Sequence, residues 1–147
     1  MLRTVTRTTS TTLASHLRIA VARLARRLRQ EGAEEGASPS QLAALGTLFH
    51  QGTSITVGEL AARERVKPPT MTRVVAALEE RGLVRREHTS ADGRIIHVTI
   101  TDAGRAAHEE YAKRRDVWLA RKLADLPREE RAILAQAAVI FERVVES

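Results

Sequence analysis

The sequence of 147 residues contains no cysteine. Disulfide bonds, thiolate zinc sites, cysteine nucleophiles and thiol-based sensing of oxidants are therefore excluded. The chain also lacks any apolar run of the roughly 20 residues that a membrane-spanning helix needs, so we expect a soluble protein. A glycine-rich phosphate loop and a nucleophile elbow are absent from the sequence as well. These absences argue against an enzyme.

The charged residues do not form the pattern of a catalytic or metal site. Adjacent carboxylates such as Glu79 and Glu80 point about 100° apart on a helix, so they cannot form a catalytic pair and are expected on solvated faces. No two histidines have the i, i+3 or i, i+4 spacing of helical metal ligands. We therefore predict neither a metal nor another cofactor. The histidines are His16, His50, His88, His97 and His108.

The net charge of +6 comes mostly from the start of the chain, because residues 1–31 carry seven Arg against one Glu. Such a basic, Thr-rich start is also found in organelle transit peptides. The excess of Arg over Lys and the abundant Ala are equally what a GC-rich bacterial genome produces. Attraction to a polyanion is thus one possibility, and composition alone does not establish it. The length suits one domain with helical extensions.

Both ends of the chain show helical periodicity. Leucine and valine recur at helical spacing from Leu13 onward, which predicts a long amphipathic helix. Ser38, Pro39 and Gln41 form a helix start with a capping box. After about residue 102 we predict a long helix, followed by a last helix that begins at Pro127. No internal repeat interrupts this order.

The middle of the chain predicts a winged helix-turn-helix. The run TVGE is a second capping box and opens a short helix that ends near Arg65. Pro68 opens the next helix after a turn of about three residues, which is helix-turn-helix spacing, and Gly82 ends it. Alternating apolar residues over 96–100 and the Asp92-Gly93 turn then predict a β-hairpin. The expected fold is mainly α with a small β-hairpin (α+β).

The helix from Pro68 is predicted to bury one stripe and to expose the side that carries Thr70 and Arg73. The buried stripe consists of Met71, Val74, Val75 and Leu78. The helix start favours an anion such as a DNA phosphate, and Arg73 is placed to bind guanine in the major groove. Taken alone, an exposed polar helix face is equally consistent with simple solvation. The hairpin favours DNA, because an arginine near its tip, Arg94, suits the minor groove.

The run TVGELAARERVKPPTMTRVVAALEERGLVRREHTSADGRIIHVTITDAG resembles the core of the MarR family of bacterial transcriptional regulators. The resemblance covers about residues 38–105 and includes the wing signature Asp92, Gly93 and Arg94. It implies a homodimer whose first and last helices interleave, leaving two winged motifs to bind the halves of a pseudo-palindromic operator. The implied divisions are 1–37 and 102–147 for dimerisation and 38–101 for DNA binding. A cytoplasmic, nucleoid-associated bacterial protein is expected.

The resemblance also assigns residues. The recognition helix would bind DNA with Lys67, Pro68, Pro69, Thr70, Thr72 and Arg73. In the turn, the family commonly has Gly where this chain has Arg65. Arg65 is therefore expected in a left-handed conformation, or else the turn differs slightly from that of the family, and in either case the side chain could reach a phosphate. The wing residues are Arg86, Asp92, Gly93 and Arg94, where Asp92 braces the wing or simply forms the turn. Dimerisation is assigned to Leu13, Leu17, Val21, Ile133, Ala137, Ile140 and Val144.

The leading hypothesis is a homodimeric repressor that binds a specific operator in double-stranded DNA and is released by a small lipophilic or aromatic ligand. The ligand pocket would be lined by His16, Phe49, Tyr111 and Trp118, although each of these side chains equally suits a core. One alternative is a chromosome-structuring protein that binds DNA through its Arg-rich surface with little sequence preference. Another is a protein-interaction module built on a winged helix.

Overall fold

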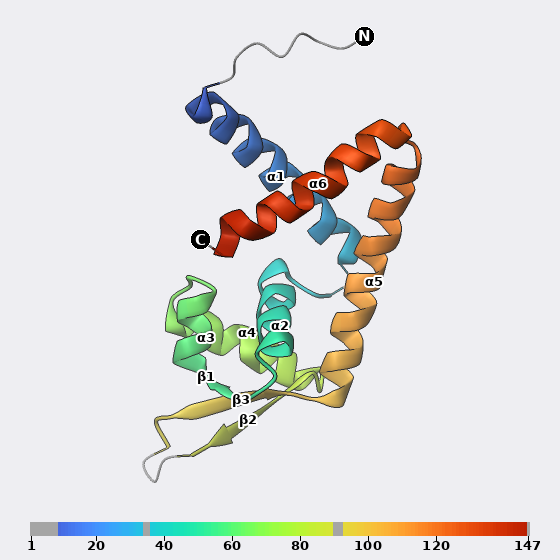
Figure 1. Cartoon of the computed structure of the whole chain (residues 1–147). Coiled ribbons are helices and arrows are strands. Elements are labelled where there is room, and N and C mark those ends of the chain that lie inside the picture. The colour runs from blue at the N-terminus through green and yellow to red at the C-terminus, as the bar shows by residue number, and fades with distance from the viewer. Residues whose placement is uncertain (1–8, 34–35, 90–92, 147) are drawn as a thin grey trace.

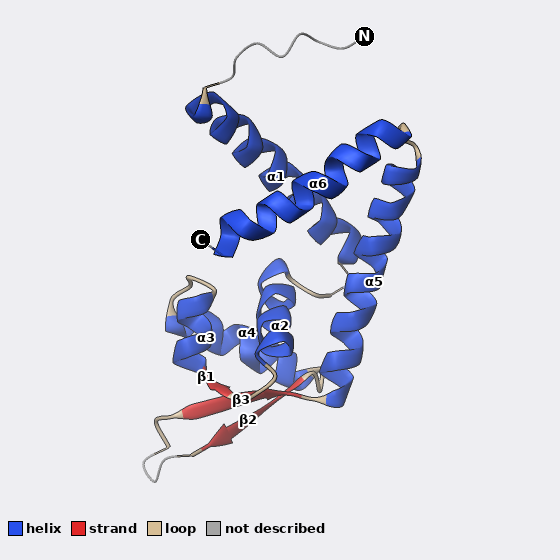
Figure 2. Cartoon of the chain, in the orientation of Figure 1, coloured by secondary structure: helices blue, strands red, loops and turns tan. Residues whose placement is uncertain are grey.

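The computed structural model describes residues 9–33, 36–89 and 93–146. Six helices and a small antiparallel sheet form a winged unit, residues 39–100, and two helical arms, Ser10–Gly32 and Arg128–Glu146 (Figures 1 and 2). A long helix, Asp102–Ala124, connects the winged unit to the second arm, and this order of elements is the one that the sequence predicted. In Figure 1, α5 rises from the end of the sheet away from the winged unit, and α6 turns back from its far end. In chain order the elements are α1 (Ser10–Gly32), α2 (Pro39–Gln51), β1 (Ile55–Thr56), α3 (Val57–Arg63), α4 (Pro68–Glu80), β2 (Val84–His88), β3 (Ile96–Ile100), α5 (Asp102–Ala124) and α6 (Arg128–Glu146).

Side-chain caps begin α2 and α3, as expected. At α2, the Ser38 hydroxyl accepts from the backbone N–H of Gln41 at 3.2 Å, and the Gln41 side chain accepts from the backbone of Ser38. At α3, Thr56 and Glu59 repeat this reciprocal pair. Each pair satisfies backbone donors that a helix start leaves without an intrahelical partner, so the sequence determines where both helices begin.

The core of the winged unit is mostly aliphatic and receives side chains from α2, α3, α4 and the sheet, and Tyr111 of α5 joins it. All four residues of the predicted α4 stripe are buried, which confirms that prediction. The largest fully buried side chains are Leu45, Leu48, Leu60, Met71, Val75, Leu78 and Val98. Because α4 is held along one whole side, its other side has a fixed direction relative to the rest of the unit.

The sheet has the order β1-β3-β2, and its first strand was not predicted. β1 contains two residues, which are too few to show the alternation that marks a strand in sequence. Ile55 pairs with Val98 and Thr56 with His97. This short pairing joins the start of α3 to β3 and thereby connects the helix-turn-helix to the wing.

A close contact joins α5 to the winged unit at Gly104. This residue is buried, and a Cβ added to it would lie 2.0 Å from the carbonyl oxygen of Leu83. The Thr101 hydroxyl donates to the carbonyl oxygen of Gly82 at 2.6 Å and accepts from the Gly104 N–H at 3.1 Å. The first turn of α5 is therefore packed directly on the loop between α4 and β2.

The arms bury little of their own surface. Within Ser10–Gly32 of α1 the buried residue is Gly32, and none of the described residues of α6 is buried. α1 packs against α5 of the same chain. None of the described helices is long and apolar enough to cross a membrane.

Replacing Gly104 with Ala is expected to destabilise the protein by about 2 kcal/mol or more, because the added methyl group overlaps a backbone oxygen. Gly58→Ala is the matched control, since the nearest atom to a Cβ there is 3.9 Å away. The control should be neutral or stabilising by up to about 1 kcal/mol, because alanine favours a helix. Chemical denaturation of both variants measures the difference, and equal stabilities would contradict the close contact.

Candidate nucleic-acid interface

The turn between α3 and α4 is fixed by its backbone and by α2. Arg65 has φ 54°, so the predicted left-handed conformation is confirmed. The N–H of Val66 donates to the carbonyl oxygen of Ala61 at 3.0 Å. The Glu64 carboxylate accepts a hydrogen bond from the Thr47 hydroxyl of α2. These contacts set the direction in which α4 leaves the turn and leave the Arg65 side chain exposed.

The first turns of α4 present the predicted recognition residues to solvent. Lys67 precedes the helix with extended backbone, and Pro68 and Pro69 occupy its first turn, where a missing N–H has no intrahelical acceptor. The Thr72 hydroxyl donates to the carbonyl oxygen of Pro68 at 3.0 Å, so its lone pairs remain available as acceptors. The exposed residues are Lys67, Pro68, Pro69, Thr70, Thr72 and Arg73.

The wing is the β2–β3 ribbon. Its strands pair from Val84 with Ile100 to His88 with Ile96. Gly93 has φ 67°, in the left-handed region, and Arg94 is exposed. The predicted wing residue Asp92 lies outside the described residues.

A surface groove of about 400 Å³ joins the recognition helix to the wing. It is lined from the start of α3, the start of α4 and the wing by Thr56, Val57, Gly58, Pro68, Thr72, Arg94, Ile95 and Ile96. The fold thus brings Pro68 and Thr72 to the same surface as Arg94, which lies 26 and 22 residues further along the sequence. Two elements suited to two different grooves of DNA lie side by side.

Arg86 does not stand free on the wing, because it pairs with Glu79 of α4. Its Nε donates to Glu79 Oε2 at 2.7 Å, and Nη2 lies 2.7 Å from the same oxygen. Both side chains are 34% exposed. The expectation that Glu79 is simply solvated was therefore wrong. No motif marks this pair, since its members lie in different elements on either side of a turn.

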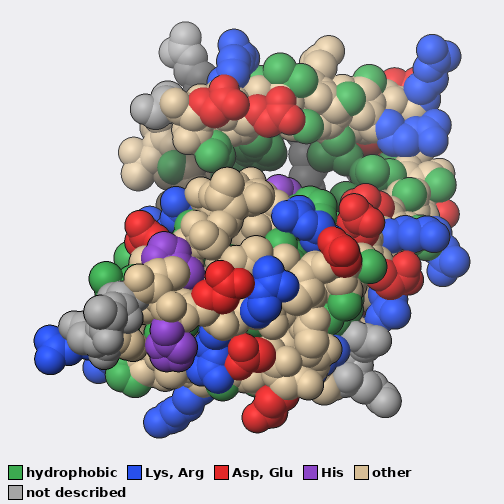
Figure 3. All heavy atoms as spheres, turned by 90° about the horizontal axis from the view of Figure 1, so that it is seen from below, with side chains coloured by type: hydrophobic (Ala, Val, Ile, Leu, Met, Phe, Trp, Pro, Cys, Tyr) green, Lys and Arg blue, Asp and Glu red, His purple; other side chains and the backbone are tan. Residues whose placement is uncertain are grey.

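Charges of both signs surround the wing. In the view of Figure 3, Lys and Arg side chains lie around it with acidic and His side chains among them. Several acidic groups are paired, as Arg85 is with Glu87 at 3.0 Å. This surface lacks the uniform positive charge that binding through an Arg-rich face alone requires.

The residues predicted for dimerisation form an uncovered apolar surface on the arms. Ile133 is 64% exposed and Val144 65% exposed on α6, and Leu13 is 49% exposed on α1. Leu17, Val21 and Ile140 are also exposed, and Ala137 is half-buried. Exposed apolar side chains that recur along two helices are more typical of an interaction site than of a solvated face.

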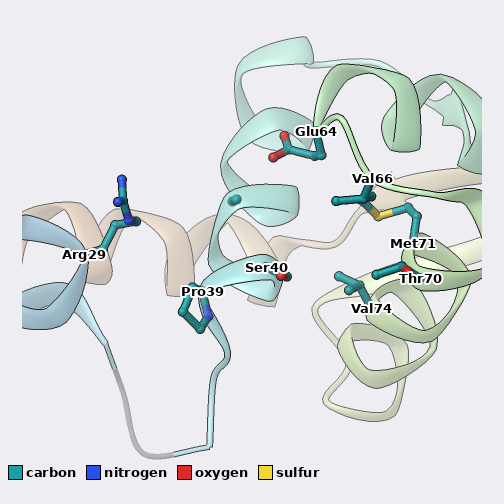
Figure 4. Close-up of a pocket in the computed structure, with 9 residues that line it drawn as sticks. Arg29, Pro39, Ser40, Glu64, Val66, Thr70, Met71 and Val74 are labelled. Atoms are coloured by element: carbon teal, nitrogen blue, oxygen red, sulfur yellow. The ribbon is translucent and has the colours of Figure 1, made fainter. Parts of the chain in front are cut away.

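The four residues predicted for a ligand pocket are not grouped within one chain. Tyr111 and Trp118 line two different cavities, Phe49 packs on the ring of His108, and His16 is exposed on α1. A different cavity of about 290 Å³ lies between the arm and the recognition helix. Figure 4 shows Arg29 of α1 on one side of it and Val66, Met71 and Val74 of the α3–α4 segment on the other.

Three aromatic rings meet where α5 crosses α2, a cluster that the sequence did not reveal. The ring centroids of Phe49 and His108 are 4.3 Å apart, and those of His50 and His108 are 5.5 Å apart. Burial, followed by the nearby His50 and Arg115, lowers the pKa of His108. The described part of the chain contains no group of three or more His, Cys, Asp or Glu residues suited to a metal ion.

Comparison with known proteins gives consistent similarities. The family model described as MarR family matches residues 37–96. The chain is 44% identical over 134 residues to an uncharacterized HTH-type transcriptional regulator of Mycobacterium bovis, covering 91% of this chain and 93% of the relative. It is 32% identical over 139 residues to the HTH-type transcriptional repressor MdtR of Bacillus subtilis, covering 92% and 87% respectively. The solved structure of a MarR family protein from Bacillus stearothermophilus matches with a TM-score of 0.76 at 25% identity, covering 97% of this chain and 99% of that one.

Proposed function

The chain belongs to the MarR family and is a DNA-binding transcriptional regulator, and from this premise we propose that it acts as a homodimeric repressor of a pseudo-palindromic operator. The observation that carries the proposal is the groove shared by the recognition helix and the wing. The relatives of this chain are named transcriptional regulators, in agreement with the expectation that the chain is not an enzyme. The role of a repressor is supported by the similarity to MdtR, which is named a repressor.

In the proposed complex, residues 38–101 bind DNA and the helices of 1–37 and 102–147 form the dimer. The exposed start of α4 enters the major groove, where Arg73 donates two hydrogen bonds to a guanine. Arg94 of the wing enters the adjacent minor groove. Arg65 contacts a phosphate from the turn, which explains why a side chain is retained in a backbone conformation that favours glycine. The two half-sites then lie about one helical turn of DNA apart, 10 to 10.5 bp.

The proposed dimer is formed by the apolar faces of α1 and α6. Their exposed Leu, Ile and Val side chains lie on helices that this chain leaves largely unburied. Since burial of apolar surface contributes roughly 25 cal/mol per Å², packing these faces against a second copy is strongly favourable.

We also propose that a small aromatic acid releases the protein from DNA. The cavity between α1 and α4 offers Arg29 for a carboxylate and apolar side chains for a ring. It is also lined by the acidic Glu64, which accepts a hydrogen bond from Thr47. A second cavity, lined by Tyr111 and also by Arg29, adjoins it. A ligand there touches the arm and the recognition helix together, so its binding favours one relative placement of the two. The pocket predicted from sequence, lined by His16, Phe49, Tyr111 and Trp118, stays a prediction for the dimer.

The competing function is that of a chromosome-structuring protein with little sequence preference. It requires binding dominated by phosphate contacts and a steep dependence on salt. The mixed charges around the wing favour a specific regulator instead. A protein-interaction module would bind no DNA in the experiments below.

Arg73→Ala and Arg65→Gly are expected to weaken DNA binding in different ways. Loss of Arg73 should cost about 1 to 3 kcal/mol and relax discrimination at one base pair per half-site. Loss of the Arg65 side chain should weaken binding to all sequences alike and reduce the salt slope by about 1 per subunit. Titration of cognate and substituted duplexes at several salt concentrations separates these effects. Unchanged discrimination in the Arg73 variant would remove it from the base-binding role.

Ile140→Glu on α6 is expected to convert the dimer to monomers, because it places a charge in the apolar contact. Ala135→Glu adds the same charge on the opposite side of the helix and should leave the dimer intact. Sedimentation velocity over a range of protein concentrations distinguishes the two. A monomeric wild-type protein, or equal dissociation in both variants, would contradict the proposed interface.

Benzoic acid and substituted benzoic acids are expected to raise the melting temperature of the wild-type protein and to weaken its binding to operator DNA. Arg29→Met should lose both effects, because the cation that faces the cavity is removed. Retention of the full response in this variant would place the ligand elsewhere. If no compound of the series shifts either quantity, release by an aromatic acid is wrong.

A further inference from the structure

The Glu79–Arg86 pair joins the two elements that carry the proposed DNA contacts. Glu79 lies in the last turn of α4, whose first turns hold the recognition residues. Arg86 lies in the middle of β2, the strand that leads toward the wing tip. The pair is therefore located at the vertex between the recognition helix and the wing.

The carboxylate of Glu79 binds the backbone of the strand as well as its side chain. β2 is an edge strand in the order β1-β3-β2, and edge strands present N–H groups that have no strand partner. The N–H of Arg86 donates to Glu79 Oε1 at 3.1 Å, while the guanidinium donates to Oε2. One side chain thus fixes both the position of the strand and the direction of its arginine.

The contacts with Arg86 favour the ionised form of Glu79. The backbone hydrogen bond from Arg86, followed by its side-chain hydrogen bond, lowers the pKa of Glu79. Hydrogen bonds between an ionised donor and an ionised acceptor are stronger than neutral ones. Both groups are two-thirds shielded from solvent, in contrast to the more exposed Arg85–Glu87 pair on the same strand.

A small movement at this vertex has a large effect at the wing. Val98 pairs with Arg86, and Arg94 lies four residues before Val98. At about 3.3 Å per residue this distance is at most about 13 Å, so a rotation of the ribbon by about 10° displaces Arg94 by about 2 Å. Such a displacement takes a hydrogen bond beyond its usual range of about 2.7 to 3.2 Å.

We propose that Glu79, acting through Arg86, is a positioning residue that fixes the wing relative to the recognition helix, so that one half-site is bound in both grooves at once. This inference rests on the proposed function. It assigns Arg86 a role that differs from the one expected from sequence, because its guanidinium is held by Glu79 instead of being directed at DNA.

The sign of the effect on affinity distinguishes positioning from charge. Glu79→Gln and Glu87→Gln each remove one negative charge from the β2 side of the winged unit, so electrostatics alone predicts tighter DNA binding for both. Positioning predicts that Glu79→Gln binds about tenfold more weakly, because the wing contact is weakened in both half-sites, while Glu87→Gln binds as tightly as wild type or more tightly. The probe is a duplex that the wild-type protein selects from a random-sequence pool.

A double-mutant cycle with Arg94→Ala then shows whether the loss concerns the wing. This change should weaken binding about tenfold in the wild-type background and less than about threefold in the Glu79→Gln background. Arg86→Gln also removes a positive charge, so it should bind at least as weakly as Glu79→Gln. The double variant should bind no more weakly than Arg86→Gln alone. Thermal melting of every variant establishes that binding is measured on folded protein, and Arg86→Gln replaces Glu79→Gln in the cycle if the latter is unfolded.

The outcomes separate the inference from the function on which it rests. If the wild-type protein selects no sequence from the pool, the proposed function is wrong and the inference falls with it. If a sequence is selected but Glu79→Gln binds as tightly as Glu87→Gln, the inference alone is wrong. The same holds if Arg94→Ala costs as much in both backgrounds. An effect of Arg86→Gln that adds to that of Glu79→Gln would show that Arg86 contacts DNA itself.

Discussion

The burial of one side of α4 is the constraint on which the rest of the structure depends. Met71, Val75 and Leu78 are each 1% exposed or less, so the helix cannot rotate about its axis without taking apolar surface out of the core. Thr70 and Arg73 gain a fixed direction from this arrangement, although neither contributes to the core. A face that binds a partner specifically requires this kind of support from side chains that never touch the partner.

The sequence predicted the winged unit well because its signals are local. Capping boxes at Ser38 and Thr56, the prolines of α4 and the left-handed Arg65 each act within a few residues, and each is present in the structure. The two-residue strand β1 and the Glu79–Arg86 pair were missed because they depend on segments that meet only after folding. The same reason applies to the cavity beside Arg29 and to the stacked rings of Phe49 and His108.

The arms and the winged unit are stabilised in different ways. The winged unit has its own core, whereas none of the described residues of α6 is buried. In the proposed dimer, the stability of the folded arms therefore depends on protein concentration, because association buries the apolar surface that the single chain leaves exposed. The proposed ligand, bound between Arg29 and Val66, would contact both the arm and the winged unit.

At Gly104 the first turn of α5 packs against the Leu83 carbonyl with no room for a side chain, so little relative movement is expected between this turn and the winged unit. In the proposed dimer, each winged unit is therefore held at the N-terminal end of one long helix, α5. A helix of 23 residues is about 35 Å long, so a tilt of about 5° at its far end displaces the recognition helix by about 3 Å. That displacement is close to the rise of one base pair, about 3.4 Å. In such a dimer, the spacing of the two recognition helices on DNA is set by the dimerisation end of α5, which does not contact DNA.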